Sequence, residues 1–261
     1  NVLPDLLALA VPNIRLSSFH RQADKESALA HNVREFGTCW SLNDLHFDKS
    51  FQFIPLTEDG AIRNCICRGG INLYRLGADV QILSPYNRSG LLSSDGLNVV
   101  FREQLNPATA ENTIKDVFFR SGDRVIILQN DWAQEVCNGD IGTYYHNAAD
   151  GMLLYGVACN RDRIAAWGGD KANPLSRLRL AYTITIHKAQ GSEYDTVVLP
   201  LSKSFASMLH RNLLYTAISR AKRRVVIVGD PDALATALQR EAQPRRSILV
   251  TKTHAYQECA A

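Results

Sequence analysis

Thr196-Val-Val-Leu199 and Val225-Val-Ile-Val228 are two short apolar runs, and the segment Arg211–Ala221 between them has the composition of a helix. Neither run alternates with polar residues, so each predicted strand is expected to be covered on both faces. Strands of that kind belong to parallel sheets, whose crossover helices cover both sides. The C-terminal part of the chain therefore predicts an α/β fold, with a parallel sheet flanked by helices.

The same alternation of strand and helix extends toward the N-terminus. Apolar runs predict strands over Phe51–Leu56 and Val80–Leu83. Helical patterns cover Asp5–Ala10, Asp24–Phe36 and Ser94–Leu105. This spacing is typical of βαβ units, which build parallel sheets.

Residues 121–176 interrupt this rhythm with short strands and turns, which predict an inserted β-module. The predicted strands are Arg124–Leu128, Gly142–His146 and Met152–Val157, with a hairpin turn at Asn147–Gly151 and a surface loop at Ala166–Pro174. The remaining residues, 1–120 and 177–261, are assigned to one α/β domain.

Composition excludes several classes of protein. The chain has 261 residues, of which 46% are hydrophobic and 21% charged, and no apolar run approaches the roughly 20 residues that cross a bilayer. Six cysteines lack a paired C-x-x-C spacing, which favours a reducing, cytoplasmic location. Cys65-Ile-Cys67 offers two ligands without a second pair, so no metal site is predicted.

Basic residues gather in one stretch, although the net charge is only +3. Between Arg177 and Arg224 there are nine Lys or Arg residues against two acids, Glu193 and Asp195. Such a stretch either meets phosphates or forms a solvated helix face, and composition alone favours the solvated face.

Two blocks in this basic stretch carry the chemistry. Thr183-Ile-Thr-Ile-His-Lys-Ala-Gln-Gly-Ser-Glu-Tyr-Asp195 and Leu213-Leu-Tyr-Thr-Ala-Ile-Ser-Arg-Ala-Lys222 resemble the last two motifs of superfamily 1 helicases. The 261 residues contain no G-x-x-x-x-G-K-S/T loop and no Asp-Glu pair that closes an apolar strand. We therefore expect half of a motor, which is inactive without the domain that supplies the phosphate-binding loop.

Further blocks fall in the order typical of one helicase family. Ile14-Arg-Leu-Ser-Ser-Phe-His-Arg-Gln22 resembles an L-x-x-x-F-R-Q block, with His20 beside the arginine. Asp79–Arg88, followed by Leu97-Asn98 and Leu105-Asn106-Pro107, is similar to the family's strand, proline turn and helix. Gly122–Val125 and Glu135–Gly142 resemble the start of its small barrel. The chain thus resembles the C-terminal half of a RecD-like helicase, the exodeoxyribonuclease V alpha-subunit family.

This resemblance implies a RecA-like parallel sheet flanked by helices, with an inserted small β-barrel over residues 121–176. It also implies an ATP-dependent DNA helicase that moves 5′-to-3′ on single-stranded DNA in recombination and repair. The implied cofactors are ATP and Mg. The implied partners are single-stranded DNA, the chain's own N-terminal motor domain and the nuclease or helicase subunits of a recombination complex.

Arg220 and Arg21 are the candidate catalytic residues. Phosphoryl transfer depends on neutralising the charge that spreads over the γ-phosphate oxygens, and arginine presents a planar, permanently charged fork to phosphate. The structural alternative is that Arg220 only pairs with a carboxylate of its own domain.

Gln190, Gly191 and Glu193 are the candidate nucleotide-binding residues. Glycine allows a close backbone approach to a phosphate or sugar, and Glu193 is placed to accept a hydrogen bond from a ribose hydroxyl. A helix C-cap explains Gly191 equally well.

The resemblance places Thr185, His187 and Lys188 toward the DNA strand. His187 has the alternative of being an ordinary satisfied polar residue. Aromatic side chains stack on unpaired bases, and Tyr86 is the first candidate, ahead of Trp132 and Tyr144, which are alternatively packing residues.

Two other functions stay open. The helicase region of a conjugative relaxase shares the late motifs, and a passive single-stranded-DNA-binding or protein-binding module would use the basic surface without hydrolysing ATP. The combination of Arg21, Glu193 and Arg220 argues against the passive module, because a binding surface has no need of γ-phosphate ligands.

Overall fold

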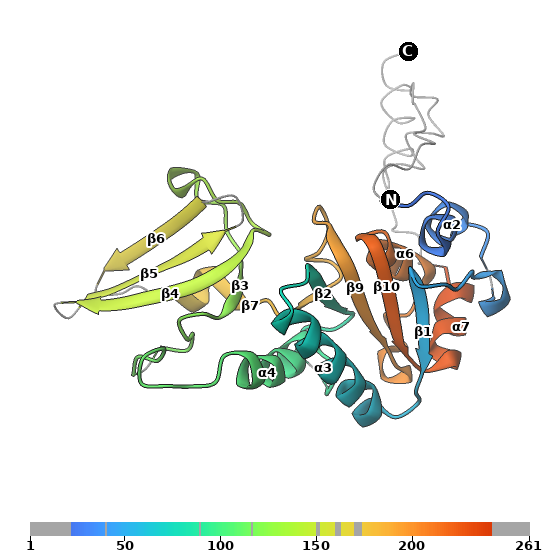
Figure 1. Ribbon diagram of the computed structural model, residues 1–261, viewed down its shortest axis with the longest axis horizontal. Helices are drawn as coiled ribbons and strands as arrows, with labels where there is room; N and C mark the ends of the chain where they lie inside the picture. Colours follow the sequence, from blue (N-terminus) through green and yellow to red (C-terminus); the bar gives the residue numbers. More distant parts are fainter. Residues whose placement is uncertain are drawn as a thin grey trace, which may run out of the picture.

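A computed structural model describes residues 22–39, 41–88, 90–115, 117–149, 152–159, 163–169 and 174–241. The predicted helix Asp5–Ala10 and the candidate Arg21 lie outside this range. The described residues form two five-stranded sheets, one parallel and one antiparallel, which lie side by side along the longest axis of the molecule (Figure 1). Within these residues, no helix is both long enough and apolar enough to span a membrane.

Every strand of sheet A runs parallel to its neighbours. The order is β1-β10-β9-β2-β8, with bounds β1 Phe51–Pro55, β10 Ala221–Gly229, β9 Tyr194–Leu201, β2 Val80–Ser84 and β8 Thr183–Thr185. Val197, Leu199, Val225 and Ile227 are fully buried. The two apolar runs therefore form central strands, as predicted, and the RecA-like α/β class is confirmed.

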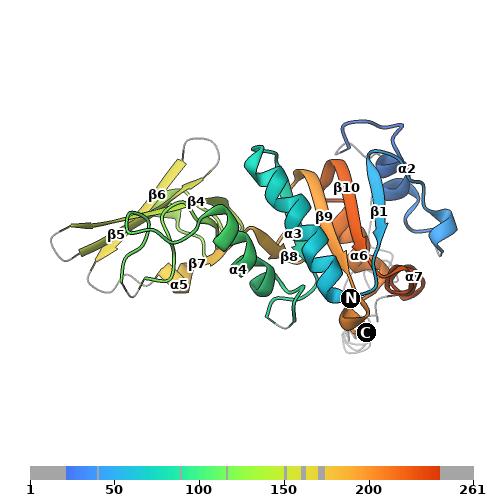
Figure 2. The same ribbon diagram turned by 60° about the horizontal axis from the view of Figure 1, so that its bottom comes forward.

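Helices cover both faces of sheet A (Figures 1 and 2). The bounds are α2 Ala28–Glu35, α3 Asp59–Arg75, α4 Ser94–Leu105, α6 Arg211–Ile218 and α7 Pro231–Gln239. The β1-to-β2 connection crosses the sheet in one direction, and the β9-to-β10 connection crosses it in the other. Right-handed crossovers then place α3 and α6 on opposite faces, and Figure 1 shows α3 in front of the sheet and α6 behind it.

Helix α3 is not predicted from the sequence, because this segment is rich in glycine. Gly60, Gly69 and Gly70 lower the helical propensity of this segment. Gly70 is nevertheless needed, because a Cβ there would lie 2.8 Å from Cζ of Phe101 in α4. The glycine therefore allows α3 and α4 to approach closely over a buried contact.

Sheet B has the order β6-β5-β4-β3-β7, with every pair antiparallel. Its strands are β3 Arg124–Ile127, β4 Ile141–Ala149, β5 Met152–Cys159, β6 Arg163–Gly169 and β7 Leu178–Leu180. The predicted hairpin is confirmed, because β4 and β5 pair as far as Ala149 and Met152. The pairings form an open sheet with β6 and β7 at its edges, so the barrel predicted for this module is not confirmed in the described residues.

Two details of the strands in sheet B differ from the sequence-based expectations. Residues 166–169 form the end of β6, where a surface loop was predicted, because they pair with β5. Trp167 holds this strand in place: its indole Nε1 donates to the Asp131 carboxylate at 2.9 Å. In addition, β7 lies beyond residue 176 in sequence and still pairs with β3 of sheet B.

A buried carboxylate joins the two sheets. Asp123 directly precedes β3 and is fully buried. Its carboxylate accepts from Asn106 Nδ2 at 2.9 Å, from the Arg120 backbone N–H at 2.8 Å and from the Tyr182 hydroxyl at 3.3 Å. Arg102 Nη1 lies 3.9 Å away. Burial raises the pKa of Asp123, and these polar contacts oppose the rise.

A second set of contacts holds the short link between β7 and β8. Asn98 of α4 donates to the Thr183 carbonyl at 2.8 Å and to the Leu180 carbonyl at 3.2 Å, and it accepts from the Thr183 N–H at 2.8 Å. Gln81 of β2 donates to the Ala181 carbonyl at 3.2 Å. Side chains of sheet A and α4 thus fix the segment through which the chain returns from sheet B.

Replacing Asp123 with Ala should lower the free energy of unfolding by about 3 kcal/mol, because buried donors then lose their acceptor. Urea unfolding of this chain measures the change. Glu111→Ala is the matched control, since Glu111 is an exposed acid on the same connecting segment, and it should change stability by less than about 0.5 kcal/mol. Equal effects of the two substitutions would contradict the role of Asp123.

Candidate functional site

The segment 186–193, which we call the crossing turn, runs from one edge of sheet A to the other. It begins after Thr185, which pairs with Ser84 at the carboxyl end of β2. It ends before Tyr194, which pairs with Ala221 at the amino end of β10. Because all strands of sheet A are parallel, the crossing turn runs from the side of the sheet where the strands end to the side where they begin. We call these two sides the carboxyl edge and the amino edge of sheet A.

Internal hydrogen bonds hold the crossing turn in shape. The Ala189 N–H donates to the Thr185 carbonyl at 3.1 Å, and the Gln190 N–H donates to the His187 carbonyl at 3.2 Å. The Ser192 N–H donates to the Ala189 carbonyl at 3.1 Å. The backbone between the two ends of the crossing turn is therefore held by hydrogen bonds within the turn.

Arg220 lies at the amino edge of sheet A, between the end of α6 and the start of β10. Its guanidinium donates from Nη1 to the Ser192 carbonyl at 3.3 Å and from Nε to the Thr216 carbonyl at 3.3 Å. Nη2 donates to Ser219 Oγ at 3.4 Å. These contacts aim the side chain along the end of the crossing turn, and the guanidinium is half-buried.

The predicted nucleotide-binding residues lie next to Arg220. Gly191 has a φ of +91°, with nothing within 4 Å of the position a Cβ would occupy. Gln190 and Glu193 are exposed on either side of it. The structure thus brings Gln190, Gly191, Glu193 and Arg220 together at one edge, with open space over the glycine.

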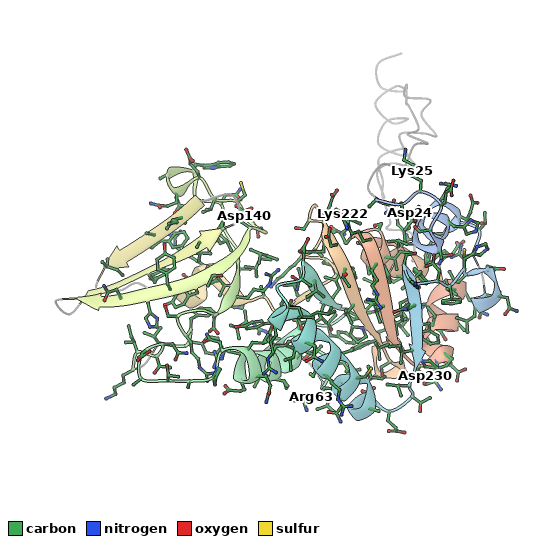
Figure 3. The ribbon with its side chains drawn as sticks, viewed as in Figure 1. Asp24, Lys25, Arg63, Asp140, Lys222 and Asp230 are labelled. Carbon is green, nitrogen blue, oxygen red and sulfur yellow. The ribbon has the colours of Figure 1, made fainter. Side chains whose placement is uncertain are left out.

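The segment that follows Arg21 reaches the same edge. Gln22 Nε2 donates to the Ala221 carbonyl at 3.4 Å, and the Ala23 N–H donates to the Lys222 carbonyl at 2.8 Å. Figure 3 shows Lys222 with Asp24 and Lys25 at one end of sheet A and Asp230 at the other end. The described neighbour of Arg21 is therefore beside Arg220 in space.

The predicted DNA-contacting residues lie at the other end of the crossing turn. Thr185 is buried, and its Oγ1 accepts from the Lys188 N–H at 3.3 Å. His187 is exposed, and Lys188 is half-buried. Thr185 thus shapes the turn from which the two basic side chains project.

Lys188 belongs to a cluster of cations that no short motif reveals. Burial lowers the pKa of Lys188, and so do the positive charges of Arg179 and Arg88, whereas Asp95 opposes them. Arg88 follows β2, and Arg179 belongs to β7. Three segments far apart in sequence therefore bring positive charge to the surroundings of Lys188.

The three candidate aromatic residues have different environments. Tyr86 is half-buried, with its hydroxyl bonded to Ser207 and its ring edge-on to Phe205 at 5.2 Å. Tyr144 is fully buried in sheet B and is a packing residue. Trp132 is 76% exposed, so it does not anchor the module.

The described residues contain no group of three His, Cys, Asp or Glu side chains arranged to hold a metal ion. Among the described residues, Cys65 and Cys67 are free thiols.

Comparison with known proteins shows which family the chain is similar to. Residues 180–228, which contain both late motifs, match the family model described as UvrD-like helicase C-terminal domain. The chain is 32% identical over 255 residues to the ATP-dependent RecD2 DNA helicase of Deinococcus radiodurans, an alignment that covers 96% of this chain and 33% of that protein. Over nearly its whole length, the chain is similar to RecD-like helicases.

Another relative of this RecD-like chain is the RecBCD enzyme subunit RecD of Mycobacterium tuberculosis, with 33% identity over 125 residues, 47% of this chain and 20% of that subunit. The chain spans about a third or less of the length of these relatives. Among solved structures, Pif1 helicase from Bacteroides in complex with ADP-AlF3 and single-stranded DNA has 18% identity and a TM-score of 0.42, covering 94% of this chain and 57% of that one.

Gly191→Ala should lower the free energy of unfolding of the RecD-like chain by roughly 1 to 2 kcal/mol, because a Cβ disfavours positive φ. Gly69→Ala is the matched control: Gly69 is exposed in α3 and has open space around it, so alanine should stabilise the helix by roughly 0.5 to 1 kcal/mol. Thermal unfolding measures both. A stabilising effect of Gly191→Ala would show that the positive φ is not required.

Proposed function

We propose that this chain is the second motor domain of an ATP-dependent DNA helicase that moves 5′-to-3′ on single-stranded DNA. One observation carries the proposal: the crossing turn holds the candidate nucleotide-binding residues at one end and the candidate DNA-contacting residues at the other. A change at the nucleotide edge of such a turn is transmitted through bonded backbone to the DNA edge. A passive binding module has no use for this connection.

In this proposal, ATP lies between the amino edge of sheet A and the N-terminal motor domain. Arg220 and Arg21 neutralise the γ-phosphate, since an arginine fork suits the charge that develops on its oxygens. Gln190 and Glu193 contact the nucleotide beside the open backbone of Gly191. The N-terminal domain supplies the phosphate-binding loop and the ligands for Mg, so the 261-residue chain alone does not hydrolyse ATP.

Single-stranded DNA passes over the carboxyl ends of β2 and β8. His187 and Lys188 meet the phosphates there, Thr185 holds the turn that carries them, and the cations of Arg88 and Arg179 extend the basic surface. Phosphate contacts of this kind give affinity without sequence preference. Tyr86 lies at the same edge, after β2, and is the residue we propose to meet a base.

We further propose that residues 1–120 and 177–261 form the motor domain and that 121–176 form its inserted module, with β7 shared between them through pairing with β3. The RecBCD name of one relative supports a place in DNA recombination and repair, beside nuclease or helicase subunits, in the cytoplasm.

Arg220→Ala in the full-length protein should lower DNA-stimulated ATP hydrolysis by a hundredfold or more, because the loss of an arginine finger costs about 10³ to 10⁵ in rate. Turnover is measured at saturating ATP and single-stranded DNA. Arg68→Ala is the control, since Arg68 is exposed on α3 and should leave turnover unchanged. Wild-type protein that binds DNA tightly and never turns over ATP would instead identify a passive module.

Lys188→Ala should weaken the binding of single-stranded DNA by this chain and lower the salt dependence of that binding. Each phosphate contact contributes about 0.7 to the slope of log K against log salt for single strands. Fluorescence anisotropy at several salt concentrations measures the slope, with Lys49→Ala, an exposed lysine before β1, as the control. An unchanged slope in Lys188→Ala would place the DNA elsewhere.

A further inference from the structure

The two residues that flank helix α6, His210 before it and Arg220 after it, both interact with residues of the crossing turn, Arg220 by a hydrogen bond and His210 electrostatically. At the amino edge of sheet A, Arg220 donates to the carbonyl of Ser192. At the other end, His187 lies close enough to His210, the residue that begins α6, to affect its ionisation. The helix has only two turns, Arg211–Ile218, so a structural change in its first turn lies close to its last turn.

His210 is the N-cap of α6. Its backbone is extended, with φ −153° and ψ 157°, and its ring Nδ1 accepts from the Leu213 N–H at 3.1 Å. A ring nitrogen that accepts carries no proton, so the cap requires a neutral imidazole with its hydrogen on Nε2. A protonated ring would face the Leu213 N–H with a second donor and would add positive charge at the positive end of the helix dipole.

The last turn of the same helix holds the guanidinium of Arg220. Thr216 provides its carbonyl to Arg220 Nε at 3.3 Å, and Ser219 provides its hydroxyl to Nη2 at 3.4 Å. Thr216 is in turn tied to the first turn, because its hydroxyl donates to the Asn212 carbonyl at 2.7 Å. The cap and the guanidinium are therefore linked through the backbone of the helix and the hydrogen bonds of Thr216.

We propose that His210 is a positioning residue for Arg220: the neutral imidazole caps α6, and protonation removes the cap and loosens the turn that aims the guanidinium. The proposal rests on the proposed function of Arg220. His210 is half-buried, and the charged or titratable groups that act on it are Arg240, which follows α7, and His187 of the crossing turn.

The pH range follows from the ionisation of His210. Burial lowers the pKa of His210 below its ordinary value, and Arg240 and His187 lower it further. A group whose folded-state pKa is depressed contributes stability above its unfolded pKa, about 6.5 for histidine, and this contribution is lost as the pH falls through the folded-state pKa. The cap is thus complete at pH 7.5 and is lost once the pH falls below the lowered pKa of His210.

The first test follows the helix itself in this chain, by hydrogen exchange and mass spectrometry of a peptide covering 211–221. His210→Ala should raise exchange about fivefold at pH 7.5, as expected for the loss of an N-cap, whereas His210→Asn, which retains a capping side chain, should resemble wild type. A peptide covering α3 is the internal control. Unchanged protection of 211–221 in His210→Ala would overturn the proposal, whether or not the protein is a helicase.

The second test uses the pH profile of DNA-stimulated ATP hydrolysis by the full-length protein. Wild type should lose kcat on acidification, and His210→Asn should lack this acid limb while matching wild type at pH 7.5. A limb that persists unchanged in His210→Asn would overturn the proposal, and a complete lack of wild-type turnover would overturn the helicase function while leaving the exchange test valid.

Discussion

The buried carboxylate of Asp123 is the contact on which the arrangement of the two sheets depends. A carboxylate without water needs donors on every side, and here the donors come from the end of α4, from the loop before β3 and from the link between β7 and β8. Each of these segments is consequently fixed relative to the others. The chain leaves sheet A and returns to it through this one polar cluster, with Asn98 and Gln81 holding the return link.

The parallel order of sheet A explains why the candidate site has two ends. Strands β8 and β9 flank β2 and point the same way, so the segment between them must travel the full height of the sheet. Helix α6, which connects the carboxyl end of β9 to the amino end of β10, makes the same journey in the same chain direction. At the amino edge, Arg220, which follows α6, bonds to Ser192 of the crossing turn, which places residues of both late motifs side by side although more than 20 positions separate them in the sequence.

Sequence reasoning succeeded where the signal is local. The helix Ser94–Leu105 agrees at both ends with the structure, because Ser93 caps its start and Asn106-Pro107 stops it. It failed for α3, whose Gly70 serves a contact with Phe101 that only the folded chain reveals, and for the end of β6, where Gly168 and Gly169 suggested a loop. Within the candidate site, the sequence alone could single out the residues of the contiguous motifs. The cluster of Arg88, Arg179 and Lys188 and the cap at His210 could not be singled out in this way, since they arise from segments that only the fold brings together.

The tight junction around Asp123 gives the molecule a mechanical property. Strand β4 has nine residues and is therefore about 30 Å long, and it extends from the junction to the free tip of the β4–β5 hairpin. Because this junction restricts the movement of sheet B relative to sheet A, the two sheets rotate together. A rotation of sheet A by roughly 10° would carry the hairpin tip through about 5 Å, from the strand length alone. A small angular change of sheet A would in this way become a larger displacement at the far end of β4.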